Sequence, residues 1–181
     1  MKKLFIALCL TLMALPVVAQ EDNSSIDKWF LFAVQATGAP AFANNGTNAV
    51  FAQADLILGY RFDEFFKVGV GVSPRYLIAN TPIGSANFFP PAKWGSFDLP
   101  VYLDLRGNIV SQESRKAVPY WNVDLGYEIG HGLYASPTLG YRFGGPRNDF
   151  LVGLTYMFTY TKGSFQTFLV HAVGLRVGFE F

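Results

Sequence analysis

Residues 173–181 read VGLRVGFEF, and this stretch decides the fold because every second residue is apolar. In an extended chain, alternate side chains point to opposite faces. The apolar face holds Val173, Leu175, Val177, Phe179 and Phe181. The other face carries glycines and charges of both signs, and similar segments recur along the chain. This pattern is typical of a barrel that is apolar outside and polar within. We therefore predict an all-β, eight-stranded antiparallel transmembrane up-and-down β-barrel.

The composition agrees with this prediction. Aromatic residues make up 17% of the chain and charged residues 15%, whereas charged residues average about 25% in soluble domains. Beyond the N-terminus no apolar run reaches the ~20 residues of a membrane-spanning helix. Backbone polar groups in lipid must then pair between strands, which only a closed barrel allows. The formal net charge is +1 and no basic patch is present, so we expect no nucleic-acid partner.

The N-terminus has the pattern of a secretory signal peptide. Lys2 and Lys3 precede an apolar stretch that runs from Leu4 to Val18 and ends in small residues. We expect a signal peptide over 1–19, a polar lead over 20–28 and the barrel over 29–181. This places the cleaved protein in the outer membrane of a Gram-negative-type bacterium. Cys9 is the only cysteine and lies in the signal, so disulfides and thiolate metal sites are excluded.

Eight segments alternate over enough residues to cross a bilayer as tilted strands, which takes ~9–11 residues. They are 29–37, 50–62, 66–78, 97–106, 120–128, 133–143, 150–160 and 168–181. An even number of strands returns both termini to the periplasmic side. On that side we expect turns at 63–65 and 144–148 and a longer polar link at 107–119. The links expected outside are 38–49, 79–96, 129–132 and 161–167.

Outward-facing aromatic residues gather near the strand ends, where amphipathic rings are most stable. The group expected below comprises Tyr60, Phe62, Tyr141, Phe143, Phe179 and Phe181. The group expected above comprises Tyr76, Phe97, Tyr127 and Tyr160. They predict two interfacial girdles.

Charges of both signs face inward and form the candidate site. The bases are Arg61, Lys67, Arg75, Arg106, Arg142 and Arg176; the acids are Asp55, Asp98, Asp104, Asp124, Glu128 and Glu180. Buried charges persist only when they are paired, and eight strands leave an interior just wide enough for side chains. We therefore predict a charge network that closes the lumen, with no cofactor and no metal. A narrow charged channel or a proton relay is the alternative.

Three prolines conflict with a regular barrel. Pro74, Pro100 and Pro137 lie inside predicted strands, although proline cannot donate to the hydrogen-bond ladder and a closed barrel has no edge strand. We expect bulges near the rim at these positions, which would shift the inward and outward phase locally.

The segments LGYRF at 58–62, LPVYLDLR at 99–106 and LGYRF at 139–143, with the terminal aromatic strand, resemble small outer-membrane β-barrel proteins of the OmpA/OmpX-like class. The resemblance covers nearly the whole chain after the expected signal peptide. It implies the fold and the membrane, and it implies that Phe179 and Phe181 are a signal for the barrel-assembly machinery during insertion. It implies no activity, because the class includes structural proteins and adhesins.

Small barrels similar to this one include lipid A deacylases and palmitoyltransferases, which use a membrane-face histidine with a serine and an acid. The chain has two histidines, His131 and His171. Ser136 lies five residues from His131 and so on the opposite strand face, while Ser164 falls in the link next to His171. No orienting acid is evident, so we expect no enzyme. A lipid-modifying enzyme and a small-solute channel stay as alternatives.

The outside link 79–96 contains Phe88, Phe89 and Trp94, which is much apolar surface for an exposed segment. Such patches mark partner or membrane contacts, so these rings are the candidate contact for an extracellular ligand or surface partner. The alternative is that they fold over the barrel mouth or lie in the outer leaflet. We predict a monomer in outer-membrane lipid with a structural or surface-interaction role.

Overall fold

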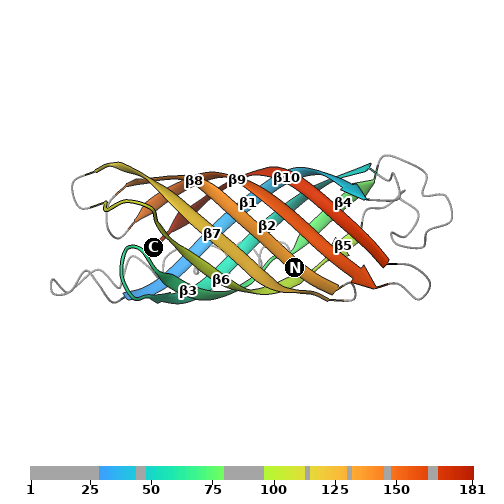
Figure 1. The fold of residues 1–181 in the computed structure, drawn as a ribbon, viewed down its shortest axis with the longest axis horizontal. Coiled ribbons are helices and arrows are strands. Elements are labelled where there is room, and N and C mark those ends of the chain that lie inside the picture. The colour runs from blue at the N-terminus through green and yellow to red at the C-terminus, as the bar shows by residue number, and fades with distance from the viewer. Residues whose placement is uncertain are drawn as a thin grey trace, which may run out of the picture.

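The chain forms one antiparallel sheet that closes on itself, with all strands tilted in the same sense around a long axis (Figure 1). The computed structural model describes residues 29–43, 48–79, 96–112, 115–129, 132–144, 148–162 and 167–181. The strands are β1 (Trp29–Ala43), β2 (Asn48–Arg61), β3 (Lys67–Val72), β4 (Arg75–Ala79), β5 (Ser96–Asp98), β6 (Pro100–Asn108), β7 (Ala117–Glu128), β8 (Gly132–Gly144), β9 (Asp149–Lys162) and β10 (Thr167–Glu180). No helix among these residues is long and apolar enough to cross a membrane.

The ten segments make eight wall strands. β3 and β4 both pair with β2 and form one wall strand, and β6 and β5, which pair with β3 and β4, form the next. β1 pairs with both β2 and β10, and this double pairing closes the barrel. The predicted closed eight-stranded barrel is confirmed.

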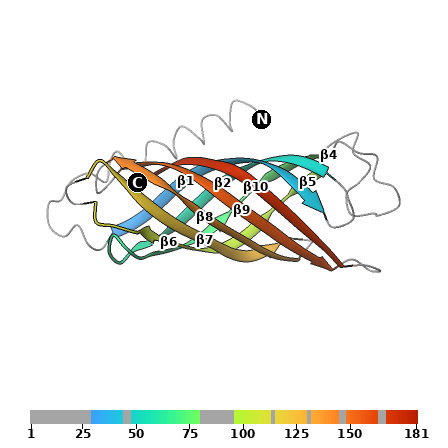
Figure 2. The same ribbon diagram turned by 45° about the horizontal axis from the view of Figure 1, so that its top comes forward.

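The two ends of the barrel differ in the links that they carry. The chain ends at one of them, while β4 and β5 reach the other (Figures 1 and 2). We call the first the C-terminal mouth; it carries the turn 62–66 and the link 109–116. We call the second the opposite mouth; β1 and β2, β4 and β5, β7 and β8, and β9 and β10 are connected there.

The predicted outside link 38–49 is wrong, because most of it belongs to strands. β1 continues to residue 43 and β2 begins at residue 48. Gly38 pairs with Ala52 and Pro40 with Val50 in the same register as the rest of the β1–β2 ladder. Gly38 and Pro40 are therefore part of the β1–β2 ladder and belong to the barrel wall.

The expected bulges at the prolines are also wrong. Gln53 pairs with Arg75 and Leu56 with Val72, so one register runs unbroken past Pro74. The register also continues past Pro100 and Pro137, as shown by the pairs Val72–Val101, Arg75–Asp98, Ala135–Phe158 and Thr138–Thr155.

The carbonyl groups explain how two of these prolines fit without a bulge. The Pro74 carbonyl accepts a hydrogen bond from the Ala54 amide at 3.1 Å, and the Pro100 carbonyl accepts one from the Ser73 amide at 2.9 Å. Each proline thus gives up only the bond that its missing N–H would make. The inward and outward phase is preserved, and Ser73 and Arg75 on either side of Pro74 are both buried.

Alternate residues of the wall face a filled interior and an exposed apolar exterior. On β2, for example, Leu56 and Leu58 are exposed while Asp55 and Ile57 are fully buried. The exposed aromatics at the strand ends include nine of the ten predicted girdle residues: Tyr60, Phe62, Tyr141, Phe143, Phe179, Tyr76, Phe97, Tyr127 and Tyr160. Phe181 is half-buried beside Phe32, with ring centroids 6.1 Å apart.

Candidate functional site

The lumen of the barrel holds the candidate site. The structure places all twelve predicted inward charges inside the wall, and none has more than 6% of its surface exposed. They form three groups along the barrel axis, and Arg106 is shared by the first two. The grouping follows from the strand registers and could not be read from alternation alone.

Glu180 is the centre of the first group, at the C-terminal mouth. Its carboxylate pairs with Arg61 at 3.0 Å, Arg106 at 3.2 Å and Arg142 at 2.8 Å, and also with Lys67. These four bases come from β2, β6, β8 and β3, while Glu180 lies on β10. One buried acid of the last strand therefore ties four other strands together.

Two residues missed from the sequence extend this group to the mouth. Asp149 pairs with Arg142 at 3.0 Å, and the Gln112 side-chain amide donates to Asp149 at 2.7 Å. The Gln112 backbone amide donates to the Glu64 carboxylate at 2.8 Å. At Gln112 the chain thus reaches into the mouth of the barrel. Alternation from Phe150 places Asp149 inward, but nothing in the sequence indicates an inward Gln112.

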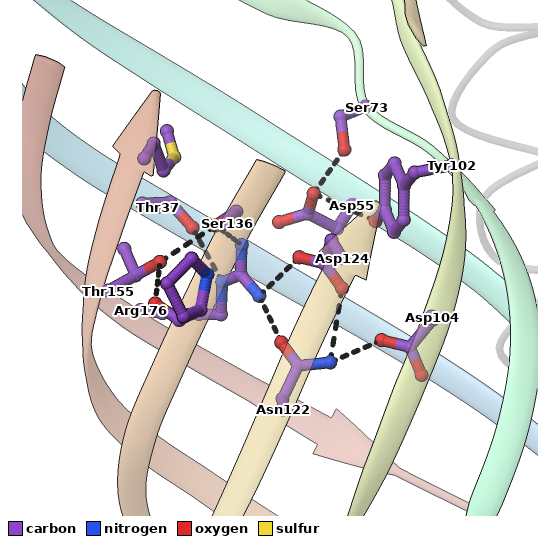
Figure 3. A network of polar contacts seen from close by, with 12 residues as sticks. Thr37, Asp55, Ser73, Tyr102, Asp104, Asn122, Asp124, Ser136, Thr155 and Arg176 are labelled. Carbon is purple, nitrogen blue, oxygen red and sulfur yellow. Dashed lines mark hydrogen bonds and ion pairs between the residues drawn. The ribbon is translucent and has the colours of Figure 1, made fainter. Parts of the chain in front are cut away.

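Arg176 is the centre of the second group, in the middle of the lumen (Figure 3). Its guanidinium donates to Asp124 and Asn122, each at 2.7 Å, and to Ser136 at 3.0 Å. Asn122 in turn donates to Asp104 at 2.5 Å. Asp104 pairs with Arg106 at 2.6 Å, so Arg106 connects this group to the Glu180 group.

Asp55 lies beside the Arg176 group and collects neutral donors (Figure 3). It accepts hydrogen bonds from the Ser73 hydroxyl, from Tyr102 at 3.0 Å and from the Gln53 amide at 2.6 Å. The ring of Tyr102 covers Gly71 so closely that a side chain there would collide with it. The glycine of β3 therefore makes room for the Tyr102 ring, which passes over it from β6 to Asp55 on β2.

Arg75 is the centre of the third group, toward the opposite mouth. It pairs with Glu128 at 3.4 Å and donates to the Gln53 side chain at 2.9 Å. Its guanidinium also lies 4.9 Å from the ring centroid of Phe51 and 5.3 Å from that of Tyr134. Asp98 is buried and is the strand partner of Arg75. Gln53 connects this group to Asp55.

Together the three groups fill the lumen with paired charges. Taking an ion out of water costs several kcal/mol, which close pairing and further hydrogen bonds must offset. Here each charged centre has several partners from different strands, as the hydrogen bonds of Glu180 and Arg176 show. Removing one partner would leave others buried and unpaired, so the network fixes the cross-section of the barrel.

The residues considered for catalysis are not assembled into a site. His171 lies on the outward face, and its Nδ1 is hydrogen-bonded to the Tyr156 hydroxyl. Ser136 lies in the lumen and is bonded to Arg176 and Thr155. In the part of the chain that the structure describes, no group of three or more histidines, cysteines or acids could hold a metal ion. His131 and Ser164 lie outside the described residues.

Comparison with known proteins supports the fold. No family model matches the chain, and no curated protein matches its sequence. Among solved structures it is similar to Neisserial surface protein A (NspA), with a TM-score of 0.60 at 15% identity, covering 88% of this chain and 98% of that chain. The chain is an eight-stranded transmembrane β-barrel.

Two further barrels are similar with lower scores. The outer membrane protein OprG from Pseudomonas aeruginosa has a TM-score of 0.47 at 14% identity, covering 85% of this chain and 94% of that one. The N-terminal β-barrel domain of Pseudomonas aeruginosa OprF has a TM-score of 0.42 at 12% identity, covering 82% of this chain and 97% of that one. At such identities the likeness concerns the fold alone.

Proposed function

We propose that the protein is a non-enzymatic integral barrel of the outer membrane, with a lumen closed by its charge network and a structural role in the envelope. The observation that carries this proposal is the set of ion pairs around Glu180. They run from β10 to four other wall strands and so cross the space through which a solute would pass. The Arg176 group crosses the lumen a second time.

Conductance across a planar lipid bilayer tests the closed lumen. We expect the wild-type barrel to insert and to give no steady single-channel current. A triple variant with Glu180, Arg142 and Arg176 replaced by alanine removes side chains from both crossings and serves as the control that should conduct. Steady current through the wild type would overturn the closed lumen and favour the small-solute channel.

The outer-membrane address and its assembly route are part of the proposal. The signal peptide over 1–19 and the lead over 20–28 lie outside the described residues. Phe179 is exposed on the girdle, and Phe181 closes the last pairing by exchanging backbone hydrogen bonds with Phe32 at 2.8 and 3.2 Å. We expect replacement of Phe179 and Phe181 by serine to reduce insertion by the barrel-assembly machinery, measured by membrane fractionation. Undiminished insertion would exclude these rings as the signal.

A surface-interaction role rests on the outside link. Phe88, Phe89 and Trp94 lie outside the described residues, so their contact role stays a prediction. Replacing all three with serine should abolish capture of any extracellular ligand or surface partner while the barrel stays folded. Capture that survived these replacements would exclude the link as the contact.

The alternative of a lipid-modifying enzyme has a direct test. His171 is bonded to a tyrosine hydroxyl, and Ser136 is sequestered in the lumen, so neither forms a nucleophile pair at the membrane face. We expect mass spectrometry to show the same acyl pattern of outer-membrane lipids in cells lacking the protein and in cells overproducing it. A changed pattern would overturn the non-enzymatic assignment.

A further inference from the structure

One polar pair stands on the apolar outer wall. Tyr156 of β9 and His171 of β10 are diagonal neighbours, because Tyr156 pairs with Val173 and His171 with Phe158. Their ring centroids are 5.8 Å apart, and the Tyr156 hydroxyl and His171 Nδ1 share a hydrogen bond. Tyr156 is 40% exposed and His171 is half-buried, so both reach the lipid-facing surface.

The pair has one hydrogen-bond donor more than it uses. A neutral tyrosine and a neutral histidine carry one O–H and one N–H between them. If the tyrosine donates to Nδ1, the proton of the imidazole is on Nε2; if Nδ1 donates, the O–H is left over. In both cases one donor is left over, and no described residue other than the pair itself bonds to either side chain.

The depth of the pair indicates which acceptor it meets. His171 lies eight residues before Phe179 on β10, a distance of roughly 20 Å along the barrel axis for a tilted strand. Phe179 belongs to the girdle at the C-terminal mouth, and the apolar band is about 25 Å tall. His171 therefore lies just inside the opposite boundary of the band, where the acyl linkages of lipids begin.

The surroundings of the pair favour a neutral acceptor over an anion. His171 is flanked in register by Phe42 on β1 and Phe158 on β9. Val173 and Leu154, next to the pair, are 53% and 66% exposed. Among the described outward side chains of β1, β9 and β10 there is no lysine or arginine. In these apolar surroundings a carbonyl oxygen needs only the donor, whereas an anion would also lose its solvation.

We propose that Tyr156 and His171 form a lipid-binding site that donates a hydrogen bond to an acyl-ester carbonyl oxygen of a lipid in the leaflet at the opposite mouth. An unpaired donor in hydrocarbon is costly, and this bond removes the cost. The site would hold the lipid's glycerol region against Phe42 and Phe158 and fix the height of the barrel in that leaflet.

Thermal unfolding in two kinds of vesicle tests the site. The full barrel is reconstituted in diester phosphatidylcholine and in its diether counterpart, which has the same headgroup and chains but no carbonyls. We expect unfolding of the wild type in diester vesicles to occur roughly 2–4 °C higher than in diether vesicles, the shift typical of one hydrogen bond in a chain of this length. Tyr156→Phe and His171→Phe should abolish the difference, and the matched control Tyr160→Phe should retain it.

The other outcomes of this experiment contradict the site. If His171→Phe lowered the unfolding temperature equally in both lipids, the phosphate or the protein itself would be the partner. If the wild type showed no difference between the lipids, the spare donor would not be bound to a carbonyl. Both results would overturn the proposal.

Solid-state NMR gives a second measurement that does not depend on stability. In His131→Ala, His171 is the only histidine, so 15N-histidine labelling reports on its ring alone. We expect its ring nitrogen signal to be dephased by 13C-labelled ester carbonyls of the diester lipid. The dephasing should be lost or weakened in the Tyr156→Phe background. No dephasing in the His131→Ala protein would overturn the proposal.

Discussion

The two ends of the lumen hold different numbers of bases and stabilise them in different ways. Near the C-terminal mouth four bases, Arg61, Lys67, Arg106 and Arg142, share two acids, Glu180 and Asp149. Toward the opposite mouth one base, Arg75, lies between two aromatic rings and pairs with Glu128 at 3.4 Å. At the first end four bases share the carboxylate of Glu180. At the second end neutral groups, the Gln53 side chain and two aromatic rings, also stabilise the one base.

This difference predicts at which end a substitution destabilises the barrel most. A charge that serves four partners is expensive to remove, because four buried bases each lose an ion pair, although Arg106 keeps Asp104 and Arg142 keeps Asp149. Arg75 keeps its cation–π contacts and its hydrogen bond to Gln53 when its acid is lost. Equivalent substitutions at the two ends should therefore have unequal effects on stability.

Glu180→Ala should have the largest effect. It leaves four buried bases without their shared acid, and we expect the free energy of unfolding to fall by about 5 kcal/mol, the upper end for a broken buried ion pair. Urea unfolding in lipid vesicles, followed by tryptophan fluorescence, measures the loss.

The matched control lies at the other end of the lumen. Glu128→Ala removes one acid from one base, and its cost should be about 1–3 kcal/mol, the range for a hydrogen bond to a charged group. Equal losses for the two variants would contradict the idea that the C-terminal mouth concentrates the stability. Glu180→Gln, which keeps the volume, separates the loss of charge from the loss of packing.

Arg176→Met should have the next largest effect on stability. It tests the middle of the lumen, between the two ends compared above. Methionine fills a similar volume but leaves Asp124 without its base and removes the hydrogen bonds that Asn122 and Ser136 accept from the guanidinium. We expect a loss of about 3 kcal/mol, the cost of leaving a buried acid unpaired.

A second substitution shows whether the cost comes from the isolated acid. In the double variant Arg176→Met with Asp124→Asn, both members of the ion pair are neutral, so part of the lost stability should return. No recovery in the double variant would mean that the packing of Arg176, not its pairing, carries the effect.

Alternation predicted the faces of the barrel but not the partners within it. That Glu180 and Arg176 face inward follows from VGLRVGFEF, because period two is set by local geometry. That Glu180 meets Lys67 and Arg142 depends on strand register and tilt, which join residues 113 and 38 positions apart. No local pattern encodes such distances.

The bulges expected at the prolines were wrong, and the inward position of Gln112 was not predicted, for a different reason. A bulge at Pro74 would be needed only if every residue of a strand had to donate a ladder hydrogen bond. Instead the ladder lacks the one bond that an N–H at position 74 would make, and the register is kept. Gln112 lies in a polar link, where sequence gives no period to follow. Its inward position depends on Asp149, the first residue of β9, and on Glu64 in the turn 62–66, which both lie at the same mouth.

Gln112→Ala should have the smallest effect and tests how far the Glu180 group depends on its edge. The substitution removes the hydrogen bond from the side-chain amide to Asp149 but keeps the backbone bond to Glu64. We expect a loss of about 1 kcal/mol, because Asp149 retains Arg142 as a partner at 3.0 Å. Hydrogen exchange should show faster exchange of the 109–116 amides and unchanged exchange of the β10 amides.

Exposed Arg115 in the same link provides the control, since Arg115→Ala alters the link without touching Asp149. If Gln112→Ala raised exchange along β10 as well, the mouth and the Glu180 group would unfold as one unit. The C-terminal mouth and the Glu180 group would then form a single cooperative unit, distinct from the rest of the barrel. If the effect stays in the link, Glu180 and its four bases hold the barrel without help from the mouth.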